Sequence, residues 1–294
     1  MEHREPILRA TARWFRQRLG LLQAGSETCR LCGKAIAGAI SSGGGHATIA
    51  GLCSACTSGI PWIRSIRCAV CGRGIPCGDC VRRTDTSFVY NRSAVSYNAG
   101  MKALLAQYKY RGSETLETTL ADMLLPAFRQ LTHEAALDAG IPHRETDRAM
   151  GERRILSISR LIWRAVTFVP ISAERAEERG FNQAERLAGL LGARFGLPVL
   201  PLLARTRHTG KQSFKNRAER FRDMRDLFAP VPEGFDMLHA LKLAAPPSRH
   251  AGTDRILLVD DIYTTGSTVN ACATVLRRAA GKSAAVYALT WARS

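Results

Sequence analysis

The sequence lacks any run of about 18 apolar residues, the length at which a segment becomes a candidate membrane-spanning helix. It also lacks an unbroken apolar stretch near its start, where Glu2, Glu5 and scattered arginines replace the core of a secretion signal. The first absence excludes a transmembrane segment. The second leads us to expect a cytoplasmic protein.

Acidic and aromatic residues are also scarce. The 294 residues include 25 Asp and Glu against 42 Lys and Arg, which gives a net charge of +17. Such an excess favours binding of nucleic acid, phosphorylated metabolites or an anionic surface. Aromatic residues make up only 7% of the chain, which weakens the interpretation as a single-stranded DNA track, because such tracks stack bases on aromatic rings. A hydrophobic content of 46% excludes wholesale disorder.

Cysteine, in contrast, is plentiful and regularly spaced. Eight of the nine cysteines form four pairs with two residues between partners: Cys29/Cys32, Cys53/Cys56, Cys68/Cys71 and Cys77/Cys80. In a reducing compartment this pattern is typical of metal sites rather than disulfides. Each pair can aim two sulfurs at one ion, and two pairs complete a tetrahedral thiolate shell for zinc.

The eight cysteines therefore predict two structural zinc sites. A sequential grouping joins Cys29, Cys32, Cys53 and Cys56 in one site and Cys68, Cys71, Cys77 and Cys80 in the other, but an interleaved grouping fits the spacing equally well. A disulfide framework or a redox pair is the alternative. Gly33 and Gly72 follow two of the pairs and would relieve a tight turn. The ninth cysteine, Cys272, is expected in the core.

The chain divides into three parts. Residues 1–27 predict a basic amphipathic helix, 28–86 form the cysteine-rich module, and 87–294 alternate strand and helix patterns. Strands are expected at 87–97, 166–171, 198–203, 255–261 and 284–291, and helices at 101–110, 114–130, 184–195 and 267–280. This alternation predicts an α/β fold with a doubly wound, mostly parallel sheet. Residues 133–165 are interpreted as an insertion and residues 230–254 mostly as loop.

The strand at 255–261 ends in Asp260 and Asp261, which would lie at the carboxyl edge of the sheet, where ligands of open α/β sheets bind. The turn that follows contains Thr264, Thr265, Gly266, Ser267 and Thr268. Its amides, its four hydroxyls and the helix N-terminus suit a phosphate dianion. The loop lacks the lysine of a nucleotide P-loop, and the chain lacks a Rossmann fingerprint. Two carboxylates beside a phosphate cradle instead indicate a sugar phosphate, and an ordinary capped turn is the alternative.

The segment Val259-Asp-Asp-Ile-Tyr-Thr-Thr-Gly-Ser-Thr268 resembles the 5-phosphoribosyl 1-pyrophosphate (PRPP) signature of type I phosphoribosyltransferases. With the cysteine pairs, the chain resembles the ComF family, competence-associated proteins with an N-terminal double zinc ribbon, here at 28–86. Three further stretches support the resemblance: Tyr108 to Gly112, Arg179 to Ala184, and Gln212 to Arg220.

The resemblance implies a type I phosphoribosyltransferase fold for residues 87–294 and roles for particular residues. Asp260 and Asp261 would hold the ribose hydroxyls, and residues 264–268 the 5-phosphate. The turn with Pro170, Ile171 and Ser172 would bind pyrophosphate together with Mg²⁺. The segment 205–225, with Arg205, Lys211 and Arg217, would be a mobile loop that closes over the reaction. Its end departs from the family pattern, since Asp223 and Asp226 stand where Asn and Gly are expected.

The expected function is thus a phosphoribosyltransferase with an unknown acceptor, serving DNA uptake or nucleotide salvage. Two alternatives remain open. One is a non-catalytic protein that binds single-stranded DNA or partners in DNA processing. The other is a sensor that binds PRPP without turnover.

Overall fold

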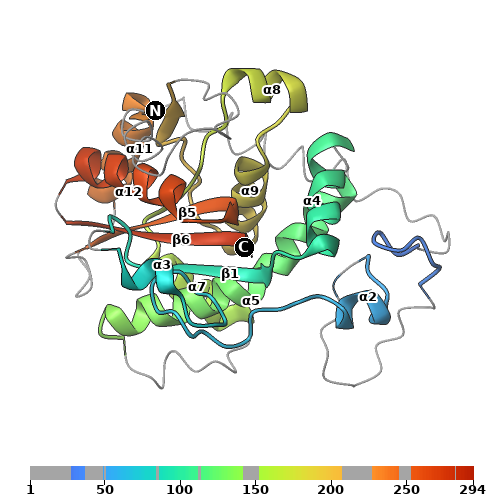
Figure 1. The fold of residues 1–294 in the computed structure, drawn as a ribbon. Helices are drawn as coiled ribbons and strands as arrows, with labels where there is room; N and C mark the ends of the chain where they lie inside the picture. The colour runs from blue at the N-terminus through green and yellow to red at the C-terminus, as the bar shows by residue number, and fades with distance from the viewer. Residues whose placement is uncertain are drawn as a thin grey trace.

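The computed structural model describes residues 28–36, 49, 51–83, 86–111, 114–141, 152–206, 227–244, 253–281 and 283–294. The predicted N-terminal helix and most of the predicted mobile loop lie outside the described residues. Four strands form a parallel sheet in the order β1-β6-β5-β2 (Figure 1). They are β1 (Asn91–Ser96), β6 (Ala284–Arg293), β5 (Asp254–Tyr263) and β2 (Ala165–Phe168). The predicted α/β class with a parallel sheet is confirmed.

The central strand β5 is buried on both faces of the sheet. Successive side chains of a strand point to opposite faces, so Leu257 and Val259 pack into one core while Ile256 and Leu258 pack into the other. A strand covered on both sides needs an almost continuous apolar run, which is what residues 256–259 provide. The strand therefore holds its carboxyl end rigidly between two layers of helices.

Helices cover both faces. On one side lie α4 (Ala99–Arg111), α5 (Glu114–Asp138), α7 (Glu152–Ile162) and α9 (Gln183–Phe195). On the other lie α12 (Ser267–Ala280), α11 (Pro232–Ala244) and the antiparallel pair of β3 (Leu203–Arg205) and β4 (Phe228–Pro230). Figure 1 shows α12 and α5 on opposite sides of the β5–β6 pair. The short helices are α2 (Ser54–Ser58), α3 (Gly78–Val81) and α8 (Ala173–Arg179). No described helix has the length and apolar character that crossing a bilayer requires.

Two interpretations of the sequence are wrong. The described parts of 133–165, residues 133–141 and 152–165, are not an insertion, because α5 continues to Asp138 and α7 buries Ile155, Ile158 and Ile162 in the core. Residues 230–254 are not mostly loop, because α11 occupies 232–244. Pro232 is the first residue of that helix, a position where a missing N–H costs no helical hydrogen bond. The prolines around 230–247 therefore flank a helix instead of excluding one.

The sheet has a switch point between β2 and β5, where the connections that leave the two neighbouring strands run in opposite directions along the sheet. From β2 the chain passes through α9 to Val199, which bridges Val166 on one side of β2, whereas β5 pairs with the other side. The helix that follows β2 packs on one face of the sheet and α12, which follows β5, packs on the other. The carboxyl ends of β2 and β5 therefore diverge around a crevice, the position at which open α/β sheets bind ligands.

Candidate functional site

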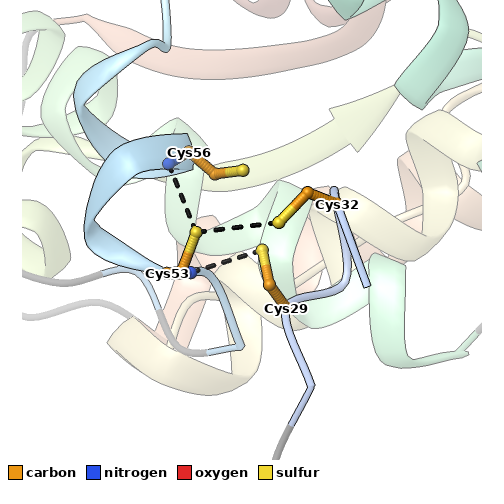
Figure 2. A group of neighbouring side chains, drawn as sticks. All are labelled: Cys29, Cys32, Cys53 and Cys56. Carbon is orange, nitrogen blue, oxygen red and sulfur yellow. Dashed lines mark hydrogen bonds between the residues drawn. The ribbon is translucent and has the colours of Figure 1, made fainter. Parts of the chain in front are cut away.

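The first cysteine group consists of Cys29, Cys32, Cys53 and Cys56, whose sulfurs all lie within 4.8 Å of one another (Figure 2). The Cys32 and Cys53 sulfurs are 3.8 Å apart, and the Cys53 amide donates to the Cys29 sulfur at 3.3 Å. Cys53 caps the N-terminus of α2 by accepting a hydrogen bond from the Cys56 amide. Amide donors that point at sulfur stabilise the thiolate form that zinc requires.

The second group consists of Cys68, Cys71, Cys77 and Cys80, again with sulfurs within 4.8 Å of one another. The turn between Cys68 and Cys71 closes with a hydrogen bond from the Gly72 amide to the Cys68 carbonyl at 3.0 Å. Gly72 has a φ of 73°, and a Cβ there would lie 2.5 Å from the Asn91 carbonyl oxygen. The tight turn thus needs glycine. The structure selects the sequential grouping over the interleaved one.

The electrostatics of both groups fit a bound cation. The pKa of Cys29 is lowered to about 6, because amide hydrogen bonds outweigh the burial that would raise it. The pKa of Cys77 is lowered to about 7 for the same reasons. The pKa values of Cys56 and Cys80 are raised by burial and by the neighbouring sulfurs. Four thiolates repel one another without a cation at their centre, so each group could hold a structural zinc ion.

The acid pair lies near the end of β5. Asp260 is buried, and its Oδ1 accepts a hydrogen bond from the Asp261 amide at 2.8 Å. Burial and then the neighbouring Asp261 carboxylate raise the pKa of Asp260 well above its ordinary value. Lys109 forms an ion pair with Asp261, and both side chains are largely buried, at 17% and 19% exposed. The ammonium group therefore compensates part of the charge of the two carboxylates.

Lys109 is a functional candidate that sequence reasoning did not single out. It belongs to the stretch Tyr108 to Gly112, which supported the family resemblance but received no role. The neighbouring Tyr108 is buried with its ring 5.2 Å from that of Phe181, in the second such stretch. Asn182 in turn donates from Nδ2 to the Val169 carbonyl at 3.1 Å. Three segments that are far apart in the chain thus meet at the switch point.

The phosphate loop, defined as residues 264–268, connects β5 to α12. Gly266 caps α12 with a φ of 78°, and a Cβ there would overlap the Tyr263 hydroxyl. The Thr265 and Ser267 hydroxyls are 2.9 Å apart. The first amides of any helix have no partner within that helix, so this turn presents donors and hydroxyls together. The turn directly follows the strand that carries the acid pair, and its role in anion binding stays a prediction.

The turn after β2 lies at the same edge of the sheet. Phe168 is in register with Val259, and the Val169 amide donates to the Val259 carbonyl at 3.0 Å. Pro170, Ile171 and Ser172 follow directly, and Ser172 precedes α8. The predicted pyrophosphate turn and the acid pair are therefore side by side on adjacent strands.

The predicted mobile loop is described only at its start. Arg205 ends β3, and its guanidinium lies 5.8 Å from the centre of the Phe228 ring. Burial and then the charge of Arg175 lower the pKa of Arg205. Lys211 and Arg217 lie outside the described residues. A role for this segment stays a prediction.

A cavity of about 460 Å³ lies beside the same region. Its lining includes Phe181, Asn182, Glu185 and Arg186 of the segment that begins α9, and Glu117 of α5. Asn182 belongs both to this lining and to the contact with the turn after β2. The cavity is thus adjacent to the switch point and carries groups of both charges.

These features define a class: an α/β protein with a parallel sheet, an acid pair and a threonine-rich turn at its switch point, and two tetracysteine groups. No family model matches the chain. It is 27% identical over 252 residues to the competence protein ComFC of Bacillus subtilis (strain 168), covering 83% of this chain and 84% of that protein. It is 26% identical over 242 residues to ComFC of Streptococcus pneumoniae, covering 81% and 86%. Competence protein F of Haemophilus influenzae is 25% identical over 255 residues, covering 83% and 92%. The chain is thus similar to competence proteins of the ComF type over about four fifths of its length.

Proposed function

We propose that this protein binds PRPP at the switch point between β2 and β5 and has a competence-related role in DNA uptake. One observation carries the proposal: the acid pair, the phosphate loop and the turn after β2 meet at one edge of the sheet. The names of the three relatives support the competence-related role. Nucleotide salvage is a second process in which a PRPP-binding protein of this kind would serve.

The proposed binding mode follows from the chemistry of each group. Asp260 and Asp261 accept hydrogen bonds from the ribose hydroxyls, the phosphate loop binds the 5-phosphate, and residues 170–172 bind the pyrophosphate. Cleavage of the anomeric bond builds positive charge on the ribose. Carboxylates fixed beneath the ring stabilise that charge without having to reorganise. Lys109 stands against Asp261, so it balances the acid pair before the ligand arrives.

The residues present also fit a Mg²⁺ ion that enters with the ligand. Magnesium is usually held by one or two carboxylates together with substrate phosphates, and the two adjacent carboxylates precede the phosphate loop by a few residues. Asp260 and Asp261 would hold the ion. When bound, it would neutralise charge on the departing pyrophosphate.

The test is calorimetric titration of the zinc-loaded protein with Mg²⁺ and PRPP, with an Asp260→Asn/Asp261→Asn variant in parallel. Saturable binding that is lost in this variant is the expected result. Asp236→Asn is a matched control, because Asp236 is an exposed carboxylate on α11. Absence of binding to the wild-type protein would refute the proposal. Pyrophosphate release with a panel of bases and amines then separates a transferase from a sensor.

Binding of single-stranded DNA is a second candidate function. The net charge of +17 supports it, and so does the competence role of the relatives. The logarithm of the binding constant for a single strand falls linearly with the logarithm of the salt concentration, with a slope of about −0.7 per neutralised phosphate. Titrations at several salt concentrations therefore test it, and lack of binding at low salt would exclude it.

A further inference from the structure

The second cysteine group is in direct contact with the phosphate loop. Arg293, near the end of β6, is only 4% exposed. Its Nη2 donates to the Cys71 sulfur at 3.6 Å, and its Nη1 donates to the Thr264 carbonyl at 2.8 Å. One buried guanidinium thus joins a sulfur of the cysteine group to the backbone of the loop.

A second arginine repeats this connection. Arg83 follows Cys80 by three residues and donates from Nη2 to the Thr265 carbonyl. Tyr263, the last residue of β5, interacts electrostatically with both arginines. The centre of the Tyr263 ring lies 4.8 Å from Cζ of Arg293 and 6.2 Å from the centre of the Phe88 ring. The loop is therefore held from the side of the second cysteine group by two arginines and an aromatic contact.

The first cysteine group makes different contacts. Cys29 and Leu52 pack into the core that contains α4 and α5, and Arg30 donates from Nη1 to the Thr119 hydroxyl at 2.8 Å. The second group instead contributes Cys71 and Cys77 to the core that contains Tyr263 and α12. Figure 1 shows α2 and α3, the short helices of the two groups, well apart. The first cysteine group therefore serves as an internal control for the effect of metal in the second group.

We propose that the metal-loaded second cysteine group positions the phosphate loop, with Arg293 as the positioning residue, so that metal in this group sets the affinity for the phosphorylated ligand. The negative charge of a metal-bound thiolate at Cys71 fixes one end of the guanidinium, and the other end fixes the Thr264 carbonyl. Without the metal, the guanidinium loses this anchor and the loop loses its shape. The first group has no such effect. The inference rests on the proposed function only in that the phosphorylated ligand is taken to be PRPP.

The coupling is reciprocal, because linkage requires that each ligand change the affinity of the other by the same factor. Magnesium and PRPP should therefore slow the release of one zinc ion of two to a chromogenic chelator. Substitution of partners that donate to metal ligands typically lowers metal affinity by about 10–100-fold. Arg293→Met should accordingly accelerate release of one zinc ion by about tenfold or more. Arg278→Met, which removes an exposed arginine of α12, should leave both release phases unchanged.

Hydrogen exchange of the loop amides tests the inference without any ligand. In the zinc-loaded protein, Arg293→Met should increase exchange at residues 264–268, and Arg293→Lys should increase it less. Cys80→Ser should act like Arg293→Met, whereas Cys32→Ser should leave the loop unchanged. If a cysteine variant does not fold, the arginine variants still test whether Arg293 positions the loop. Loop exchange that is the same in Arg293→Met and wild type would overturn the inference. Faster exchange in a protein that binds no PRPP would refute the proposed function and leave the positioning role standing.

Discussion

Removing the ammonium group of Lys109 should destabilise the protein through the acid pair. Lys109→Met keeps most of the aliphatic volume but leaves Asp261 without its cation, next to the buried Asp260. Breaking a fully buried ion pair costs about 3–5 kcal/mol, whereas exposed pairs contribute about 0–1 kcal/mol. The two side chains are 17% and 19% exposed, so we expect a loss of about 2–3 kcal/mol.

Thermal and urea unfolding measure this loss. At about 2–4 °C per kcal/mol for a protein of this size, the expected decrease in Tm is roughly 5–10 °C. Lys102→Met is the matched control, because Lys102 is an exposed lysine on the same helix. In a double-mutant cycle, Asp261→Asn should recover about 1–2 kcal/mol of the loss. Equal effects of Lys109→Met and Lys102→Met would refute the assignment of Lys109 to the acid pair.

Three further predictions concern single side chains. Asp260→Asn should raise Tm near neutral pH while it weakens PRPP binding. The folded-state pKa of Asp260 is raised, so the stability that this carboxyl contributes is fully present below its unfolded pKa of about 3.9 and is lost as pH rises. The gain in Tm from Asp260→Asn should therefore grow from pH 4 upward. A gain that does not change with pH would contradict this. Gly266→Ala should cost about 1–2 kcal/mol, because φ is 78° and the added Cβ meets Tyr263; chemical denaturation measures the cost, and a wild-type midpoint would count against it. Gly72→Ala should reduce the zinc content from two ions to one, since its Cβ would lie 2.5 Å from the Asn91 carbonyl; metal analysis of the purified variant that finds two ions would exclude this.

Local patterns predicted the strand–turn–helix unit around the acid pair closely. Its apolar run, two acids and threonine-rich turn each have a local physical reason, and the structure has β5 at 254–263 and α12 at 267–280. The same holds for the buried face of α9, where Leu187, Leu191 and Phe195 recur at helical spacing. Patterns of this kind depend only on neighbouring residues. They are therefore visible in the sequence.

The errors arose where local signals conflict with packing. Prolines around residues 230–247 favoured a loop, but Pro232 occupies the one helical turn that tolerates proline. Charged residues around α7 hid an apolar stripe of three isoleucines that packs on the core. The helix expected at 114–130 continues to Asp138, because its last turns bury Leu131, Ala135 and Ala136 in the core. In each case tertiary contacts outweigh intrinsic preference.

The sequence by itself determined that eight paired cysteines could bind two metal ions and that an acid pair precedes a threonine-rich turn at a helix N-terminus. The physical reason is that thiolate pairs, a buried strand and a helix N-terminus are built from residues close together in the chain. Only the tertiary structure decided the grouping of the cysteines, the ion pair between Lys109 and Asp261, and the contact of Arg293 with Cys71 across 222 positions of sequence. Such contacts depend on strand order and on which helix covers which face, and no local pattern records them.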